Sequence, residues 1–454
     1  MDAHDIKLIL LALAAIAVLV LLVTKLKVNP FIALLVSALL LGAGAQVGRP
    51  EGMDLMAVLK AFQDGLGATL GSTAGIIALG VMLGKLMAES GGAEVLAVRF
   101  NKFFGPHRAG WCIMALAVAV GLTTWFAVGL LLLLPILLTL TRESGRPFLL
   151  LAIPLISCLS VMHGLMPPHP GPVIAVEKLA ANTGLVLVWG FVIGLPVAAV
   201  AGPVFARWAV KRVQANPPEM TPAAPQRIAP GFGLTLFTML LPVALMLVST
   251  LAELTLDKAE PLRHAATFIG HPTIALSISV LFALWSFGVR CGYDRPQLLK
   301  FTEQSIAGVG MAILVVGAGG GFARVLREAG VAASLGDMAH AWSLPPLVYA
   351  WMVAAFIRVA TGSATVAITA AAELMAPLLG TMPGVNRELL VIAIGCGSLF
   401  CSHLNDGGFW IVKESFGLTV GQTLRTWTVT ETIVGIAGLL LTLLVDMIWR
   451  AVML

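Results

Sequence analysis

The chain has 454 residues, of which 59% are hydrophobic and 11% charged, and its formal net charge is +5 at neutral pH. Soluble globular proteins carry about 25% charged residues, so this composition excludes a soluble fold and predicts an integral membrane protein. The basic residues are scattered over many short segments, which argues against nucleic-acid binding. The five cysteines stand singly in or beside apolar runs, so we expect no metal site and no cofactor.

Apolar runs of spanning length recur from one end of the chain to the other. The first, Ile6–Thr24, has the length of a spanning helix and is followed by no clear signal-peptide cleavage site. The run Trp111–Leu140 is too long for one crossing and is expected to form two legs of a hairpin. The sequence therefore predicts an all-α polytopic membrane protein with about 12–14 membrane segments, some of them broken or re-entrant.

Basic residues in short loops predict the orientation. They gather at 25–27, 85–108, 207–227 and 290–300. Because Lys and Arg are retained on the cytoplasmic side, an external N-terminus places all four loops inside, provided that 111–140 forms a hairpin.

A proline-rich stretch near the midpoint divides the chain. Residues 216–230 hold five prolines, so they predict an exposed cytoplasmic linker at 214–230 rather than a helix. The linker would separate an N-terminal transmembrane repeat, 1–213, from a C-terminal transmembrane repeat, 231–454.

Weak internal similarity supports that division. At an offset of 239 residues Phe62 aligns with Phe301 and Gly91 with Gly330, and at 240 His163 aligns with His403. If each half has an odd number of crossings, the halves have opposite topology. That is the inverted-repeat plan of secondary transporters, whose broken helices form the substrate site between the repeats.

The stretch His163–Pro172 breaks the apolar pattern of the first half with four prolines. Proline lacks a backbone N–H and clashes with the preceding turn, so this stretch cannot be one continuous helix. Non-helical backbone survives at membrane depth only inside protein or beside a water-filled cavity. We therefore expect a binding site here, with His163 and His169 as hydrogen-bonding or titrating groups, although a lone histidine can also serve only in packing.

The stretch Ser402–Gly408 breaks the second half in a similar way. Asp406 is costly in apolar surroundings unless it is paired, solvated or protonated, so it can exchange a proton. Alternatively, Asn405 or Asp406 can simply cap the helix that follows. The two roles are compatible, because a helix N-terminus also attracts a substrate carboxylate.

A hydroxyl-rich break lies about forty residues before each of these stretches. The first holds Thr123 and Thr124, and the second is Thr361–Thr365. Such residues supply hydroxyls, although small residues also pack helices together. Arg358 precedes the second break and needs an anionic partner, for which a substrate carboxylate, Glu373 and a lipid phosphate are the candidates.

Sequence motifs of enzymes are missing from the chain. It contains no GxSxG elbow, HExxH motif, Walker A loop or Cys/His metal cluster. We therefore expect a transporter powered by an ion or solute gradient, not an enzyme.

Several of these motifs together resemble the gluconate permeases, proton symporters for gluconate and related sugar acids. The resemblance covers nearly the whole chain and is carried by Gly84–Met87, Ser90–Gly92, His163-Gly164, Pro167–Pro172, Arg358, Gly362–Ala367, Ser402–Asp406, Gly408–Trp410, Lys413-Glu414, Phe416–Thr419, Thr426-Trp427 and Glu431-Thr432. It implies a bacterial inner-membrane symporter, and by fold analogy a homodimer with a scaffold and a moving transport domain. The family usually carries an acidic residue where this chain has Ala127, so proton coupling or substrate choice can differ here.

The sequence thus predicts import of gluconate or a related sugar acid by proton symport. The partners expected are the carboxylate substrate, protons, the lipid bilayer and a second copy of the chain. Another small carboxylate such as D-serine, a passive channel and a membrane scaffold remain as alternatives. The proton-linked groups expected are Asp406, His403 and His163. The substrate-binding residues expected are Thr123, Thr124, His163, Pro168, His169, Gly171, Arg358, Thr361, Gly362, Ser363, Thr365, Ser402, His403, Asn405 and Asp406.

Overall fold

A computed structural model describes residues 3–46, 54–105, 108–122, 124–215, 228–331, 334, 344–381, 384–404 and 406–453. Over these ranges the chain forms helices and no strand. Seven helices are long and apolar enough to cross a membrane, and shorter apolar helices lie between them. The all-α polytopic membrane fold predicted from the sequence is therefore confirmed.

The helices of the first half differ widely in length. They are α1 (Ala3–Thr24), α2 (Pro30–Gln46), α3 (Leu55–Glu89), α4 (Gly92–Phe104), α5 (Ala109–Gly121), α6 (Phe126–Ser144), α7 (Phe148–Leu165), α8 (Pro170–Lys178), α9 (Thr183–Ala199), the π-helical η2 (Val200–Val204) and α10 (Phe205–Ala209). The run 111–140 falls on α5 and α6 with a break between them, so its expected division into two helices is confirmed.

The second half is likewise built of helices of different lengths. They are α11 (Phe232–Thr255), α12 (Pro261–Gly270), α13 (Pro272–Ala283), η3 (Leu284–Gly288), η4 (Val289–Cys291), α14 (Arg295–Ala307), α15 (Gly310–Glu328), α17 (Pro346–Thr361), α18 (Ala364–Met375), η5 (Ala376–Thr381), α19 (Arg387–Leu399), α20 (Gly407–Ser415), α21 (Val420–Thr423), the π-helical η6 (Leu424–Thr428) and α22 (Val429–Met453).

Polar caps explain where several of these helices begin. Asp54 accepts a hydrogen bond from the third residue of α3, and Asn182 and Asn386 do the same for α9 and α19. Asp294 forms a reciprocal capping box with Gln297 at the start of α14. Each cap satisfies backbone N–H groups that the first turn of a helix leaves free. Apolar helices can therefore start and stop where the chain must turn.

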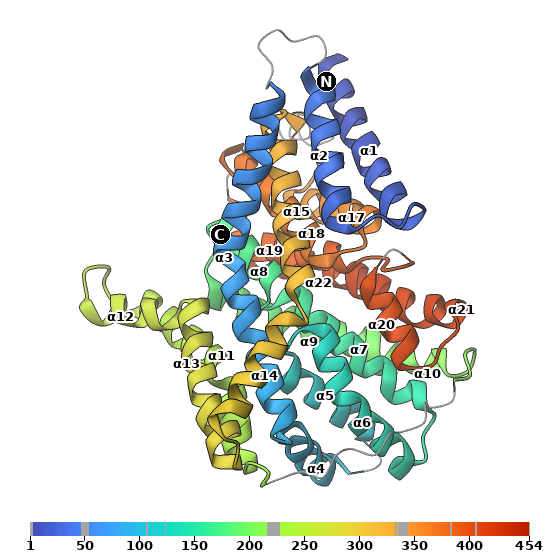
Figure 1. Ribbon diagram of the computed structural model, residues 1–454, viewed down its shortest axis with the longest axis vertical. Coiled ribbons are helices and arrows are strands. Elements are labelled where there is room, and N and C mark those ends of the chain that lie inside the picture. Colours follow the sequence, from blue (N-terminus) through green and yellow to red (C-terminus); the bar gives the residue numbers. More distant parts are fainter. Residues whose placement is uncertain are drawn as a thin grey trace.

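Several helix contacts join the two halves of the chain. α3 packs on α15, α7 on α19 and α9 on α22, so each of these pairs joins one helix from each half. Four further contacts also join one helix from each half. They are α2 with α15, α13 with α3, α8 with α18, and α20 with α6. In Figure 1, α3 descends from the top of the view, whereas α14 and α15 ascend beside it.

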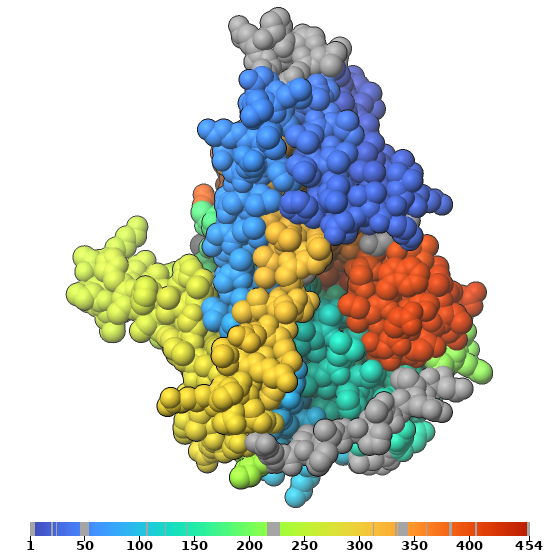
Figure 2. All heavy atoms as spheres, viewed as in Figure 1, coloured from blue at the N-terminus to red at the C-terminus, as the bar shows by residue number. Residues whose placement is uncertain are grey.

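Many large apolar side chains lie on the outer surface of the helices. α3 and the α14–α15 pair cross the face shown in Figure 2, with α1 and α2 on one side above α20 and α21. Leu10, Phe237, Leu440 and Met447 are all more than half exposed. Apolar exposure on this scale is unfavourable in water and suits contact with lipid tails.

The crossing of α3 and α15 depends on glycine at close range. Gly65 and Gly320 face each other, and a Cβ built on Gly65 would lie 2.6 Å from the carbonyl oxygen of Gly320. Gly71, two turns further along α3, has open space where its Cβ would lie. Small residues let backbones of membrane helices approach in this way.

Replacing Gly65 by alanine should therefore destabilise the protein, because the new methyl group would meet backbone atoms of α15. We expect a cost of about 1–3 kcal/mol, as for other overpacked helix crossings, seen as a lower thermal unfolding midpoint in detergent. Gly71→Ala is the matched control and should leave the midpoint unchanged or raise it, since alanine favours helix. Equal midpoints for the two variants would contradict the assigned crossing.

Candidate substrate site

The break between α17 and α18 lies directly after Arg358. The C-cap residue Gly362 has φ +71°, a left-handed conformation that favours glycine, and its N–H donates to the Arg358 carbonyl at 2.9 Å. Ser363 then caps α18, accepting from the Val366 N–H at 3.3 Å. The predicted residues Thr361, Gly362 and Ser363 thus end one helix and start the next.

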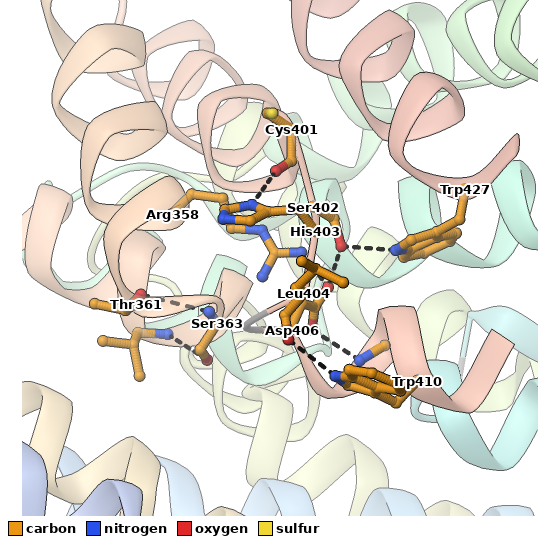
Figure 3. A network of polar contacts seen from close by, with 12 residues as sticks. Arg358, Thr361, Ser363, Cys401, Ser402, His403, Leu404, Asp406, Trp410 and Trp427 are labelled. Carbon is orange, nitrogen blue, oxygen red and sulfur yellow. Dashed lines mark hydrogen bonds and ion pairs between the residues drawn. The ribbon is translucent and has the colours of Figure 1, made fainter. Parts of the chain in front are cut away.

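The break between α19 and α20 centres on Asp406, which caps α20 by accepting from the Gly408 N–H at 2.8 Å. The cap predicted from the sequence is confirmed. The other carboxylate oxygen accepts from Arg358 Nη2 and from the Ser402 hydroxyl. Trp427 of η6 in turn donates its indole N–H to Ser402 at 2.6 Å. Figure 3 shows these side chains converging from α17, the α19–α20 break and η6.

The Arg358–Asp406 ion pair is buried, with 3% of Arg358 and 9% of Asp406 exposed. Removing both charges from water is costly, and only close pairing with further hydrogen bonds offsets that cost. Asp406 has these bonds, whereas Arg358 does not. Over the described ranges, its Nε and Nη1 groups have no hydrogen-bond partner. The guanidinium can therefore bind a second anion.

Glu373, one candidate partner for Arg358, lies elsewhere. It is buried on α18 and contacts Lys178 of α8 at 3.2 Å and Arg327 of α15 at 3.7 Å. The possibility that Glu373 neutralises Arg358 is thus wrong, because two other cations hold its carboxylate. The Lys178–Glu373 pair links α8 of the first half to α18 of the second.

The proline stretch of the first half forms the break between α7 and α8. His169 occupies the N-cap position of α8 without a capping side-chain bond, and its Nε2 instead shares a 2.6 Å hydrogen bond with the Gly121 carbonyl at the end of α5. His163, in the last turn of α7, stacks on Trp125 with ring centroids 6.0 Å apart. Its Nδ1 is buried without a partner in the described part of the chain. His169 therefore fixes the break, and His163 keeps a free polar atom.

The two sets of breaks meet in the middle of the molecule. Phe126, at the start of α6, packs on Trp427 with ring centroids 5.0 Å apart. His163 lies within electrostatic reach of Arg358. A small cavity of ≈ 20 Å³, enough for about one water, opens beside Trp125, Pro168 and His169. The first-half break thus lies close to the Arg358 site, although Arg358 and Asp406 do not line this cavity.

The remaining predicted residues divide into packing and site positions. Thr124 is buried and donates to the Val120 carbonyl at 2.8 Å, so its hydroxyl is used within its own turn. Gly171 allows α8 to approach Ile368 of α18, and Thr365 is buried on α18. The His403 Nδ1 bonds to the Cys401 carbonyl, not to Asp406. Thr123 and Asn405 lie outside the described residues.

One acidic residue without a predicted role lies beside this cluster. Glu431 is 1% exposed on the first turn of α22, one turn after Trp427. Its neighbour Thr430 is also buried. The signal was present in the sequence, because Glu431 is an acidic residue inside the apolar stretch 429–448. Within the described ranges no three His, Cys, Asp or Glu side chains gather as metal ligands would.

Comparison with known proteins decides the family. The family model described as GntP family permease matches residues 6–448. The chain belongs to the GntP permease family. This GntP permease is therefore a transporter, not an enzyme, and a multi-pass protein of the bacterial inner membrane.

Relatives match over nearly their whole length. A gluconate permease of Pseudomonas aeruginosa is 42% identical over 451 residues, covering 98% of this chain and 99% of the relative. The Gnt-II system L-idonate transporter of Escherichia coli is 39% identical over 430 residues, covering 94% and 96%. The crystal structure of the Alcanivorax borkumensis YdaH transporter, described as having an unusual topology, aligns with a TM-score of 0.62. It covers 91% of this chain and 97% of its own at 15% identity, so it supports the fold alone.

Breaking the Arg358–Asp406 pair from one side should destabilise the permease strongly. Asp406→Asn keeps a capping side chain but leaves Arg358 buried without its anion, at a cost of about 3–5 kcal/mol. Adding Arg358→Met should recover part of that loss, so thermal unfolding of the two single variants and the double variant should be clearly non-additive.

The Arg450–Asp446 pair of α22 supplies the control, because 51% of the Arg450 side chain is exposed, although only 13% of the Asp446 side chain is. Its removal should cost about 0–1 kcal/mol. Additive losses at Arg358 and Asp406 would show that the two side chains do not form the pair described.

Proposed function

We propose that this permease imports gluconate or a related sugar acid by proton symport. The observation that carries the proposal is a buried arginine, Arg358, with one carboxylate partner and two N–H-bearing nitrogens left without partners among the described residues. The names of the relatives, gluconate permease and L-idonate transporter, support a sugar acid as the substrate.

The substrate carboxylate would bind the free side of the Arg358 guanidinium. Arginine presents a planar fork of donors that matches a carboxylate, and burial strengthens such a contact. Ser363, at the N-terminus of α18, lies five residues from Arg358 in the same break. The partial positive charge of that helix end favours an anion as well. Both features therefore favour a carboxylate over a neutral sugar.

The substrate hydroxyls need polar partners nearby. The free Nδ1 of His163 is one, since a neutral imidazole can donate or accept. The Thr430 hydroxyl on α22 is another, because it is buried and has no hydrogen-bond partner in the described part of the chain. Unpaired buried polar groups are costly, so a polyhydroxylated substrate that satisfies them gains affinity and specificity.

Proton coupling follows from the charge of the site. Arg358 is already neutralised by Asp406, so a substrate anion would add an uncompensated negative charge to a buried region. Uptake of one proton with the anion removes that cost. The sequence predicts Asp406 as the proton-linked group, with His403 and His163 as helpers, and this stays a prediction.

The arrangement of the chain suits alternating access. We propose two repeats of opposite topology, 1–213 and 231–454, joined by the linker 214–230. The helix contacts between the two halves and the opposite directions of α3 and α15 support this division. The homodimer implied by the family resemblance also stays a prediction, which the mass of the detergent-solubilised particle would measure.

Reconstituted permease should accumulate labelled gluconate when the outside of the liposome is made more acidic than the inside. With one proton per substrate, each unit of pH difference drives about tenfold accumulation. Unlabelled L-idonate should compete. Flux without accumulation would indicate a passive channel instead, and competition by D-serine but not by sugar acids would indicate the other substrate class.

Arg358→Lys should reduce uptake at least tenfold although it keeps the positive charge. A lysine ammonium cannot contact Asp406 and a substrate carboxylate through one planar fork, so binding should weaken more than the maximal rate. Arg295→Lys on α14 is the control, because Arg295 is exposed. Normal uptake by Arg358→Lys would contradict the role of the guanidinium in binding the substrate.

A further inference from the structure

Glu431 is a buried carboxyl group that the function proposed above does not use. It lies on the first turn of α22 with 1% of its surface exposed. Neither of its carboxyl oxygens has a hydrogen-bond partner in the described part of the chain. A carboxylate in that position is costly, because the Ser160 hydroxyl beside it replaces little of the water that the carboxylate has lost. A protonated carboxyl carries no such charge penalty.

Arg358 lies within electrostatic reach of Glu431 but does not form a hydrogen bond with it. Asp406 also acts on Glu431 electrostatically, and the Ser160 hydroxyl of α7 acts on it from the first half. The site therefore holds one permanent cation and two carboxyl groups. Two unpartnered guanidinium nitrogens and two unpartnered carboxyl oxygens belong to the same buried cluster.

The other elements packed on η6 and α22 provide few competing groups. These elements are α7, α9, η2, α17, α19, α20 and α21. In their described parts, α9, η2 and α21 hold no ionisable side chain, and the ionisable residues of the others are Cys158, His163, Tyr349, Arg358, Arg387, Glu388, Cys396, Lys413 and Glu414. η6 itself holds Arg425, which is exposed. Arg358 and Asp406 are the charged residues that act electrostatically on Glu431.

The two carboxyl groups differ in how firmly they are held. Asp406 accepts from Arg358, from Ser402 and from the Gly408 N–H, so three donors fix its carboxylate. None of these three donors bonds to Glu431, whose two carboxyl oxygens have no hydrogen-bond partner in the described part of the chain. A substrate carboxylate can thus bind the free guanidinium nitrogens without displacing Asp406. The negative charge of the substrate then lies close to the Glu431 carboxyl group.

We propose that Glu431 binds the proton that is transported with the substrate. Without its proton, the Glu431 carboxylate is the second anion near Arg358, and this costly buried state favours uptake of a proton. When the substrate carboxylate takes its place, one proton from water bonds to a Glu431 oxygen, and the net charge of the site stays at one negative. On release the substrate leaves Arg358, and the O–H bond of Glu431 breaks. Asp406, which the sequence predicts as the proton-linked group, has a different part in this proposal and holds Arg358 in position throughout.

This inference rests on the proposed function and names its proton-binding residue. Because substrate and proton bind together, substrate affinity falls as pH rises, and proton uptake and binding are linked. Glu431→Gln mimics the protonated carboxyl permanently. It should bind substrate at every pH and exchange it across the membrane, but it should not couple that movement to protons.

The test uses full-length permease in liposomes and two assays with labelled gluconate. One assay measures exchange without a pH difference, and the other measures accumulation under a difference of one pH unit. We expect Glu431→Gln to keep exchange within about threefold of the parent protein and to lose the roughly tenfold accumulation that one pH unit drives. Glu303→Gln, an exposed position on α14, is the matched control and should keep both activities.

Several outcomes would overturn the inference. One is full accumulation by Glu431→Gln. Another is loss of accumulation with normal exchange in Asp406→Asn but not in Glu431→Gln, which would assign the proton to Asp406.

If Glu431→Gln is inactive in exchange as well, Glu431→Asp decides. Its shorter carboxyl should keep proton uptake with a shifted pH profile of exchange, and an unchanged profile would contradict the proposal. A parent protein that moves no sugar acid in either assay would instead contradict the proposed function.

Discussion

The buried ion pair between Arg358 and Asp406 is the interaction on which the site depends. Each residue lies next to a helix break, so the pair connects the end of α17 to the start of α20. The cost of burying two charges is met by the hydrogen bonds of Ser402 and Gly408 to Asp406. Broken helices are needed here because only a helix end leaves backbone N–H groups free for this purpose.

Anion binding and proton coupling then become one electrostatic problem. The Arg358–Asp406 pair is neutral, but two guanidinium nitrogens have no hydrogen-bond partner among the described residues, so they attract an anion. That anion also adds a negative charge to a buried region, which is unfavourable. In the mechanism that we propose, a proton that enters with the anion compensates the added charge. Substrate movement would then be linked to the proton gradient through the carboxyl groups near Arg358.

Much of the fold and part of the site could be predicted from the sequence. The proline-rich stretch 167–172 and the polar stretch 402–408 predict two helix breaks, and both lie at breaks in the structure. The sequence also indicates Asp406 as a helix cap, which the structure confirms. The alignment of His163 with His403 was less informative. His163 lies inside α7 and His403 beyond the end of α19, whereas the residues at equivalent helix starts are His169 and Asp406. A fixed sequence offset cannot align the two breaks, because they differ in length.

The partner of Arg358 could not be found from sequence alone, because Asp406 is 48 residues away and Glu373 only 15. The fold decides between them by placing Lys178 and Arg327 beside Glu373. A role for Glu431 could not be predicted from the sequence for a related reason. An acidic residue in an apolar run is visible in the sequence, but its closeness to Arg358 depends on how α22 packs against α17.

Calorimetric titration of the purified permease with gluconate, repeated in buffers of different ionisation enthalpy, tests the central claim most directly. It counts the protons taken up as substrate binds, without any contribution from movement across a membrane. The charge balance at Arg358 predicts about one proton per gluconate bound. Binding with no proton uptake, at any pH between 6 and 8, would contradict it.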